Sequence, residues 1–156
     1  MAGREPACGV TQMKILAAVD FSTVTEQVLQ TLVQMAATFP APVCLVHVAP
    51  PDPDFVGYEP GPQVVRGQVA AEHHTRHQEL QQMADRLRAD GVEVTAVLLQ
   101  GSTVATIIAE ADRLEADLLV LGSHGRGAVH NMLVGSVAEG VVRASKVPVL
   151  LVPTRR

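Results

Sequence analysis

Short apolar runs alternate along the chain with longer segments of mixed polarity. Each run is apolar over consecutive positions, which is typical of a strand buried on both faces of a sheet. The five predicted strands cover residues 13–20, 41–50, 92–99, 117–122 and 147–152.

The segments between the runs have the periodicity or composition of helices. From Val24 onward the apolar residues recur at steps of three and four, which predicts an amphipathic helix. The predicted helices cover residues 21–39, 64–90, 102–116 and 136–145.

Polar residues and a glycine mark the expected helix ends. Ser22 or Thr23 is expected to cap the first helix, and Ser102 or Thr103 the third. Gly91 is a natural C-terminal cap for the second helix.

Strands that alternate with helices predict an α/β fold with a parallel sheet covered by helices on both faces. No shift in composition divides the chain, so we expect one domain over residues 13–156 after a flexible tail, residues 1–12. Residues 50–63 form a loop rich in Pro and Gly, whose path the sequence does not define.

The composition of the chain excludes some classes of binding partner. The 156 residues include three Phe, one Tyr and no Trp, so the core is aliphatic, and the net charge is −4. A nucleic-acid binder would need a basic face or stacking aromatics, so we expect no nucleic-acid partner. No apolar run approaches the ~18 residues of a membrane span, and residues 1–12 lack the apolar segment of a signal peptide. We expect no membrane contact and a cytoplasmic location.

The two cysteines do not form a disulfide framework, which favours a reducing compartment. Cys44 lies in an apolar run and is expected to be a small buried residue. Cys8 lies in the N-terminal tail.

Parallel α/β sheets bind ligands beyond the carboxyl ends of their strands, where the strand order reverses. The residues expected there are Asp20, residues 48–50, residues 100–101 and the segment from Gly122 onward. Asp20 could contact a ribose hydroxyl or an adenine amino group, or cap the first helix.

The segment from Gly122 to Ser136 reads GSHGRGAVHNMLVGS. Gly122 and Gly125 flank a predicted turn, in which glycine permits positive φ and close approach of a ligand. Gly135 and Ser136 stand at a helix start, where unpaired N–H groups favour phosphate. The stretch has no P-loop lysine and no G-x-G-x-x-G pattern, so the residues alone leave open a phosphate cradle or ordinary turns.

Several histidines are weaker candidates. His73 and His77 share a helix face and, with His74, fit a solvated surface better than a metal site. His47 is expected to form hydrogen bonds within the fold. His124 is a weak candidate for acid–base chemistry.

With these residues in view, the chain resembles the universal stress protein family from about residue 13 to 153. Gly122, Gly125, Gly135 and Ser136 match the pattern G-2x-G-9x-G-[ST] of its ATP-binding members. The segments AAVDFS, LVHVAP and VPVLLVP add to the likeness. The resemblance implies a Rossmann-like, open five-stranded parallel sheet in the order 3-2-1-4-5, and a homodimer formed through the last strand.

The resemblance also implies roles for individual residues. Asp20 contacts the ribose or adenine, and Ala18, Val19 and Val48 line the adenine pocket, partly through backbone groups. The phosphates are held by the motif residues with the Val137 N–H nearby; for Arg126, phosphate contact and a free surface side chain both stay open. The nucleotide is ATP, with ADP or AMP as alternatives, and the resemblance leaves open an accompanying Mg²⁺. These roles are expected of Ala18, Val19, Asp20, Val48, Gly122, Gly125, Arg126, Gly135, Ser136 and Val137.

Two features depart from the family's usual pattern. Gly140 lies inside a predicted helix, where it lowers helix stability by roughly 1 kcal/mol relative to Ala; it permits close packing or is merely tolerated. Ala138 removes a hydroxyl that could have aided binding.

We therefore expect a homodimeric ATP-binding regulatory protein of the stress response, with no catalytic residue and no protein-held metal. A nucleotide-free interaction scaffold and a slow ATP hydrolase are the alternatives. The chain has no G-x-S-x-G pattern and no convincing carboxylate pair. The apolar final strand, as a sheet edge, would be closed by pairing with a second copy or protected by Pro148 and Pro153.

Overall fold

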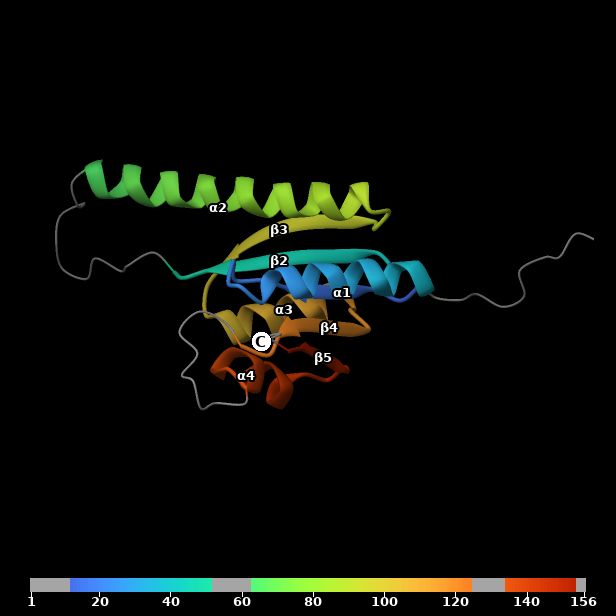
Figure 1. Cartoon of the computed structure of the whole chain (residues 1–156). Coiled ribbons are helices and arrows are strands. Elements are labelled where there is room, and N and C mark those ends of the chain that lie inside the picture. The colour runs from blue at the N-terminus through green and yellow to red at the C-terminus, as the bar shows by residue number, and fades with distance from the viewer. Residues whose placement is uncertain (1–11, 52–62, 125–133, 154–156) are drawn as a thin grey trace, which may run out of the picture.

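The computed structural model describes residues 12–51, 63–124 and 134–153. Five parallel strands form one sheet, which four helices flank (Figure 1). The elements are β1 (Ile15–Ala18), α1 (Thr25–Thr38), β2 (Val43–Ala49), α2 (Gln63–Ala89), β3 (Val94–Gln100), α3 (Thr103–Leu114), β4 (Leu118–Gly122), α4 (Ser136–Ala144) and β5 (Val149–Val152). Residues 1–11 of the predicted N-terminal tail and residues 52–62 of the proline-rich loop lie outside the described residues.

The strand order is β3-β2-β1-β4-β5, as the sequence resemblance implied. The central strand β1 pairs in parallel with β2 and β4, so that Ala17 lies beside Leu45 on one side and Val120 on the other. The chain winds from β1 toward β3, then crosses back to β4 and continues to β5. The direction of winding therefore reverses between β1 and β4.

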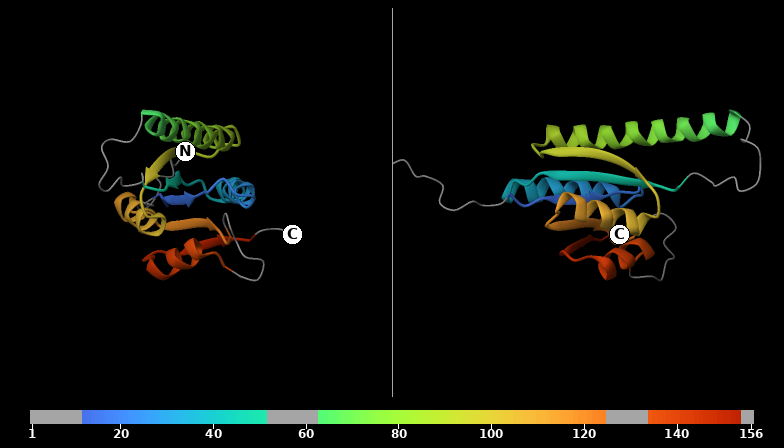
Figure 2. Two further views of the ribbon diagram at one scale, coloured as in Figure 1. Left: turned by 90° about the vertical axis from the view of Figure 1, so that its left-hand side faces the viewer. Right: turned by 180° about the vertical axis from the view of Figure 1, so that it is seen from behind.

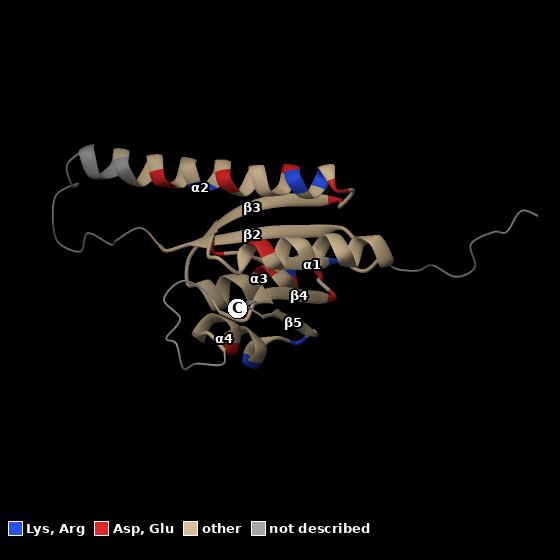
Figure 3. Cartoon of the chain, viewed as in Figure 1, with Lys and Arg blue, Asp and Glu red and all other residues tan. Residues whose placement is uncertain are grey.

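Helices cover both faces of the sheet, as predicted: α1 and α2 lie on one face, and α3 and α4 on the other (Figure 2). Alternate strand residues supply the two cores. Ala17 and Leu45 face α1 and α2, whereas Leu16 and Val46 face α3 and α4. The strands carry few charged residues, as expected for a sheet buried on both faces, and the charges lie mainly on helices and connections (Figure 3).

The start of α1 differs from the prediction. Its N-cap is Val24, and no side chain caps the helix, so the proposed caps Ser22 and Thr23 are wrong. The preceding turn is the reason: Phe21 has a φ of 58°, and the Ser22 N–H donates to Asp20 Oδ1 at 3.1 Å. The turn delays the helix by several residues.

The other predicted helix ends are close to those observed. Gly91 has a φ of 86°, and its N–H donates to Arg88 O while the Val92 N–H donates to Leu87 O. These two hydrogen bonds define a Schellman motif and confirm Gly91 as the cap of α2. Ser102 is the N-cap residue of α3, although its side chain makes no capping hydrogen bond.

The packing of α4 against α3 explains why a glycine, Gly140, lies inside α4. A Cβ at this position would lie 2.8 Å from Cγ2 of Val104 on α3. The missing side chain therefore lets α4 approach α3 closely, which is the first of the two explanations considered from the sequence.

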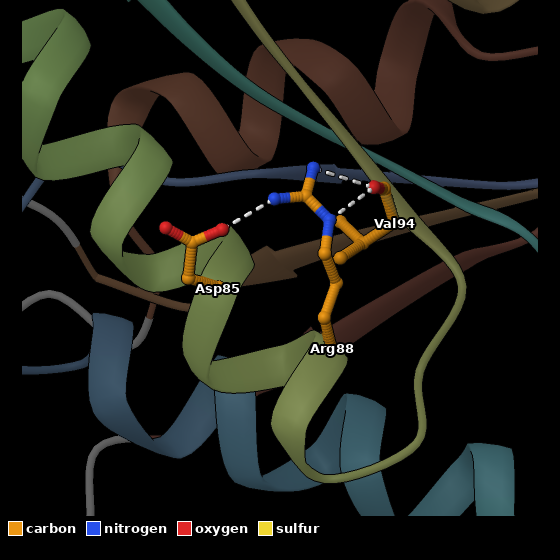
Figure 4. A network of polar contacts seen from close by, with 3 residues as sticks. All are labelled: Asp85, Arg88 and Val94. Atoms are coloured by element: carbon orange, nitrogen blue, oxygen red, sulfur yellow. Dashed lines mark hydrogen bonds and ion pairs between the residues drawn. The ribbon is translucent and has the colours of Figure 1, made fainter.

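Helix α2 covers one edge of the sheet. It contains 27 residues, runs along β3, and extends past the carboxyl end of that strand (Figures 1 and 2). Near its C-terminal end, Arg88 donates through Nε and Nη2 to the carbonyl of Val94 at 3.2 and 2.9 Å (Figure 4). Asp85 accepts a further hydrogen bond from Arg88 Nη1 at 2.6 Å.

Among the described helices, none is long and apolar enough to cross a membrane.

Candidate functional site

The carboxyl ends of β1, β2 and β4 meet where the winding of the sheet reverses. Parallel sheets leave a crevice at such a point because neighbouring connections depart to opposite faces. Asp20 follows β1, Val48 lies near the end of β2, and Gly122 ends β4. The topology thus brings the predicted residues of these strands to one edge of the sheet.

Asp20 is half-buried and lies two residues after the end of the central strand. Its Oδ1 accepts the N–H of Ser22, an Asx-type contact that fixes the carboxylate within the β1–α1 turn. Asp20 is therefore not the N-cap of α1. A fixed carboxylate at this position can accept hydrogen bonds from the hydroxyls of a sugar.

The three residues predicted to line an adenine pocket divide between the two faces of the sheet. Ala18 and Val48 face the α3 and α4 side, whereas Val19 belongs to the core beneath α1 and α2. The Val19 N–H donates to Val46 O at 2.9 Å, and the Val19 carbonyl lies 2.8 Å from Nδ1 of His47. Both backbone groups of Val19 are thus engaged within the fold.

The two ends of the segment between β4 and α4 are joined. Ser123 is buried, its N–H donates to Val152 O at 2.8 Å, and its carbonyl accepts the N–H of Gly135 at 2.7 Å. The chain therefore returns from its excursion to the point of departure, as the glycine spacing suggested. Gly125 and Arg126 lie outside the described residues.

Helix α4 begins at this closure. Gly135 is its N-cap, Ser136 is its first residue, and no side chain caps it. Ser136 and Val137 are exposed. The first N–H groups of a helix lack intrahelical partners and carry partial positive charge. The start of α4 therefore offers donors for an anion beside the end of β4.

Gly122 has a different role from the one expected. It is the last residue of β4 and does not adopt positive φ, and a Cβ there would collide with Cγ1 of Val24. Contact between β4 and the start of α1 thus requires glycine at this position. The space beside Gly122 is filled by protein.

The histidines fall into three settings. His47 is buried and hydrogen-bonded within the fold, which confirms the expectation. His74 is exposed and lies 3.0 Å from Nε2 of Gln78, within the predicted solvated helix. Nδ1 of His124 lies 2.9 Å from the Ser123 hydroxyl. Within residues 12–51, 63–124 and 134–153, no three His, Cys, Asp or Glu side chains gather as metal ligands.

Comparison with known proteins agrees with this architecture. The model of the universal stress protein family matches residues 12–153. The chain belongs to this family.

Two of its relatives are similar over most of their length. A universal stress protein of Methanocaldococcus jannaschii, MJ0531, is 29% identical over 141 residues, covering 89% of this chain and 81% of the relative. A universal stress protein of Thermus aquaticus is 30% identical over 118 residues, covering 72% and 77% of the two chains.

Solved structures of similar proteins extend the comparison. The protein MJ0577 superposes with a TM-score of 0.78 at 25% identity, covering 94% of this chain and 99% of that one. A universal stress protein in complex with cAMP superposes with a TM-score of 0.63 at 26% identity, covering 92% and 98%.

An ion pair between a buried glutamate and an exposed arginine of this universal stress protein lies away from the carboxyl edge. Glu110 on α3 accepts two hydrogen bonds from Arg113, at 2.8 and 2.6 Å, and these lower the pKa of the carboxyl group.

Cys44, near the start of β2, is half-buried rather than buried. The pKa of its thiol is raised to about 11. Burial is the larger cause of this shift, and the negative charge of Glu110 is the second. Cys44 is therefore a protonated packing residue near neutral pH.

Sequence reasoning missed three features of the site. The left-handed conformation of Phe21 has no sequence signal, because such positions usually hold Gly or Asn. Arg76 reaches His47 across 29 positions of sequence. Ser123 stands inside the glycine motif, but only the fold shows that it joins the two ends of the segment.

Proposed function

We propose that this universal stress protein binds an adenine nucleotide at the carboxyl edge of its sheet. Asp20 accepts hydrogen bonds from the ribose or adenine, and the start of α4 holds the phosphates. Ala18 and Val48 contact the base. We take ATP as the nucleotide because the glycine motif resembles that of the ATP-binding members of the family, and ADP and AMP are the alternatives.

The observation that carries the proposal is the hydrogen bond between Gly135 and Ser123. It holds the N-terminus of α4 at the carboxyl edge that also carries Asp20. A positive helix end and a carboxylate at one edge suit a ligand with phosphate at one end and hydroxyls at the other. The related protein with bound cAMP supports an adenine nucleotide as the ligand class.

We infer that the role is regulatory rather than catalytic. Glu110, the buried acid of the described residues, is held by Arg113, and Cys44 is protonated near neutral pH. Mg²⁺ would arrive with a triphosphate, whose oxygens are the hard ligands it prefers. A nucleotide-free scaffold and a slow hydrolase remain the competing functions.

The proposal includes a homodimer and a cytoplasmic location. Strand β5 is an edge of the sheet and carries the exposed side chain of Leu150. Pairing of two β5 strands across a two-fold axis would close that edge. The low cysteine content agrees with a reducing compartment.

Isothermal titration with ATP and Mg²⁺ tests the nucleotide site. Asp20→Asn removes the charge, and Ser136→Pro removes an N–H at the first helical position, where proline is compatible with a helix. We expect each variant to weaken ATP binding about tenfold, as loss of a charge-assisted hydrogen bond does. Asp112→Asn, on the exposed pair with Lys146, is the matched control and should bind as wild type.

The outcomes separate the competing functions. No heat of binding with wild-type protein would leave the scaffold as the better function. Binding that neither site variant weakens would move the nucleotide away from this edge. Release of phosphate at a rate proportional to protein concentration, lost in both site variants, would favour the hydrolase.

A further inference from the structure

The turn between β1 and α1 is held in an unfavourable conformation. Phe21 has a φ of 58°, which is rare for a bulky residue and destabilises the backbone. The hydroxyls of Ser22 and Thr25 are buried and have no hydrogen-bond partner within the described residues. Such features persist only when surrounding structure enforces them, and they occur preferentially at functional sites.

His47 contacts this turn from the neighbouring strand. Its Nδ1 lies 2.8 Å from the carbonyl of Val19, the residue before Asp20. Its ring packs against Phe21 with a centroid distance of 4.4 Å and an interplanar angle of 46°. The imidazole is 5% exposed and therefore rigidly enclosed. One side chain thus contacts the residues on both sides of Asp20.

Arg76 defines the protonation of that imidazole. Its Nη1 lies 3.1 Å from Nε2 of His47. Because a guanidinium has only donors, Nε2 must accept and carries no proton. The neutral ring then has its proton on Nδ1, where it donates to Val19. Helix α2 therefore selects the tautomer that holds the end of β1.

We propose that His47 is a positioning residue for nucleotide binding, with Arg76 selecting its tautomer. This inference rests on the proposed function. His47 faces the α1 and α2 side of the sheet, as Val19 does, whereas Ala18 and Val48 of the proposed base pocket face the other side. It acts through the turn: the hydrogen bond to Val19 and the ring packing on Phe21 fix where Asp20 points.

The tautomer can be measured directly in the nucleotide-free protein. Long-range ¹H–¹⁵N correlation of the imidazole rings, assigned by loss of one spin system in His47→Asn, should show His47 with its proton on Nδ1. Arg76→Met, which keeps an apolar stem but no donor, should shift the Nε2 resonance. Arg86→Met is the matched control, since Arg86 lies on the same helix and pairs with Glu26. An Nε2-protonated ring in the wild type would overturn the proposal.

The effect on the site is measured by ATP titration at a temperature where every variant is folded. His47→Phe keeps a ring against Phe21 but loses the donor to Val19, and we expect it to raise the Kd about tenfold. His47→Asn keeps a donor near the position of Nδ1 and should recover most of that loss. Arg76→Met should raise the Kd in the same direction, and it keeps the proposal testable if His47→Phe does not fold. Unchanged affinity in both His47→Phe and Arg76→Met would overturn the positioning role, even with a lower melting temperature.

A second readout distinguishes this inference from the proposed function. Hydrogen exchange of the Ser22 amide reports its contact with Asp20 without any nucleotide. Faster exchange in His47→Phe than in wild type and His47→Asn would support the positioning role even if wild type bound no ATP. Equal exchange in all three proteins would overturn it, whatever the outcome for ATP.

Discussion

The two edges of the sheet are protected in different ways. At β3 the chain covers its own edge, because α2 runs along the strand and Arg88 donates twice to the outward carbonyl of Val94. At β5 a strand of four residues forms the edge and leaves Leu150 38% exposed. An open apolar strand edge invites pairing with another chain. Among the described residues, one edge is thus covered by a helix of the same chain, and the other is the edge at which we propose that a second copy pairs.

The largest effect is expected where α2 is anchored to the sheet. Leu80 of α2 is 0% exposed and lies in the core with Ala17 and Leu45. Leu80→Ala should lower the free energy of unfolding by about 2–5 kcal/mol, since it removes buried carbons and leaves a cavity. Urea denaturation measures this difference. Val142→Ala, at a 48% exposed position of α4, is the control and should change stability by less than about 0.5 kcal/mol.

An equal loss in both variants would show that α2 is no better anchored than the exposed surface near the other edge. The closed edge would then owe its protection to something other than packing of α2.

The second effect concerns the open edge. Leu150→Lys places a positive charge on the β5 strand of each copy in the proposed dimer, and like charges in an interface oppose association. The dimer Kd should rise on the order of 100-fold, about 2.7 kcal/mol. Light scattering over a dilution series measures the molar mass. Met13→Lys, another exposed apolar position outside β5, should leave the dimer intact.

A wild-type protein that stays monomeric at high micromolar concentration would contradict the dimer. A Leu150→Lys protein that remains as dimeric as wild type would place the interface elsewhere.

A smaller effect is expected at Gly140, where α4 packs on α3 on the side of the open edge. Gly140→Ala improves helix propensity by about 1 kcal/mol, but its Cβ would press on Val104, and overpacking typically destabilises by about 1–3 kcal/mol. We expect a net loss of about 1 kcal/mol in chemical denaturation. The double variant Gly140→Ala/Val104→Ala should be less destabilised than the sum of its parts. Stabilisation by Gly140→Ala alone would mean that the contact relaxes and the glycine is merely tolerated.

Much of the fold follows from pattern, because an apolar run between helices has few alternatives to a buried parallel strand. The strand order came with the resemblance to a family rather than from the periodicity. The boundaries were less predictable. The run at residues 13–20 contains a strand of only four residues, Ile15–Ala18, since its last residues form the turn that carries Asp20. The turn could not be predicted from the sequence, because a phenylalanine such as Phe21 gives no indication of a positive φ.

The candidate site was predictable in its residues but not in its connections. The glycine spacing indicated a loop that returns to a helix start, and the bond between Ser123 and Gly135 agrees with it. Gly122 was expected to leave room for a ligand, yet Val24 fills that space. The contact of Val24 with Gly122 and that of Arg76 with His47 depend on how the helices pack on the sheet. A local sequence pattern does not predict that packing.

The last effect, of about the same size, distinguishes two sources of protection at the β3 edge: the hydrogen bonds of Arg88 to Val94 and the packing of α2. Arg88→Met keeps the apolar stem of the side chain and removes both hydrogen bonds to Val94. Because the arginine is partly exposed, water can replace the lost donors, and we expect a loss of about 1 kcal/mol in urea denaturation. Asp85→Ala removes only the exposed carboxylate partner of Arg88 and should change stability by less than about 0.5 kcal/mol. If Arg88→Met and Asp85→Ala were equally stable, the packing of α2 alone would protect the edge strand β3. If Arg88→Met also associated into larger oligomers as its concentration is raised, the guanidinium would be the group that keeps this edge from pairing with another chain.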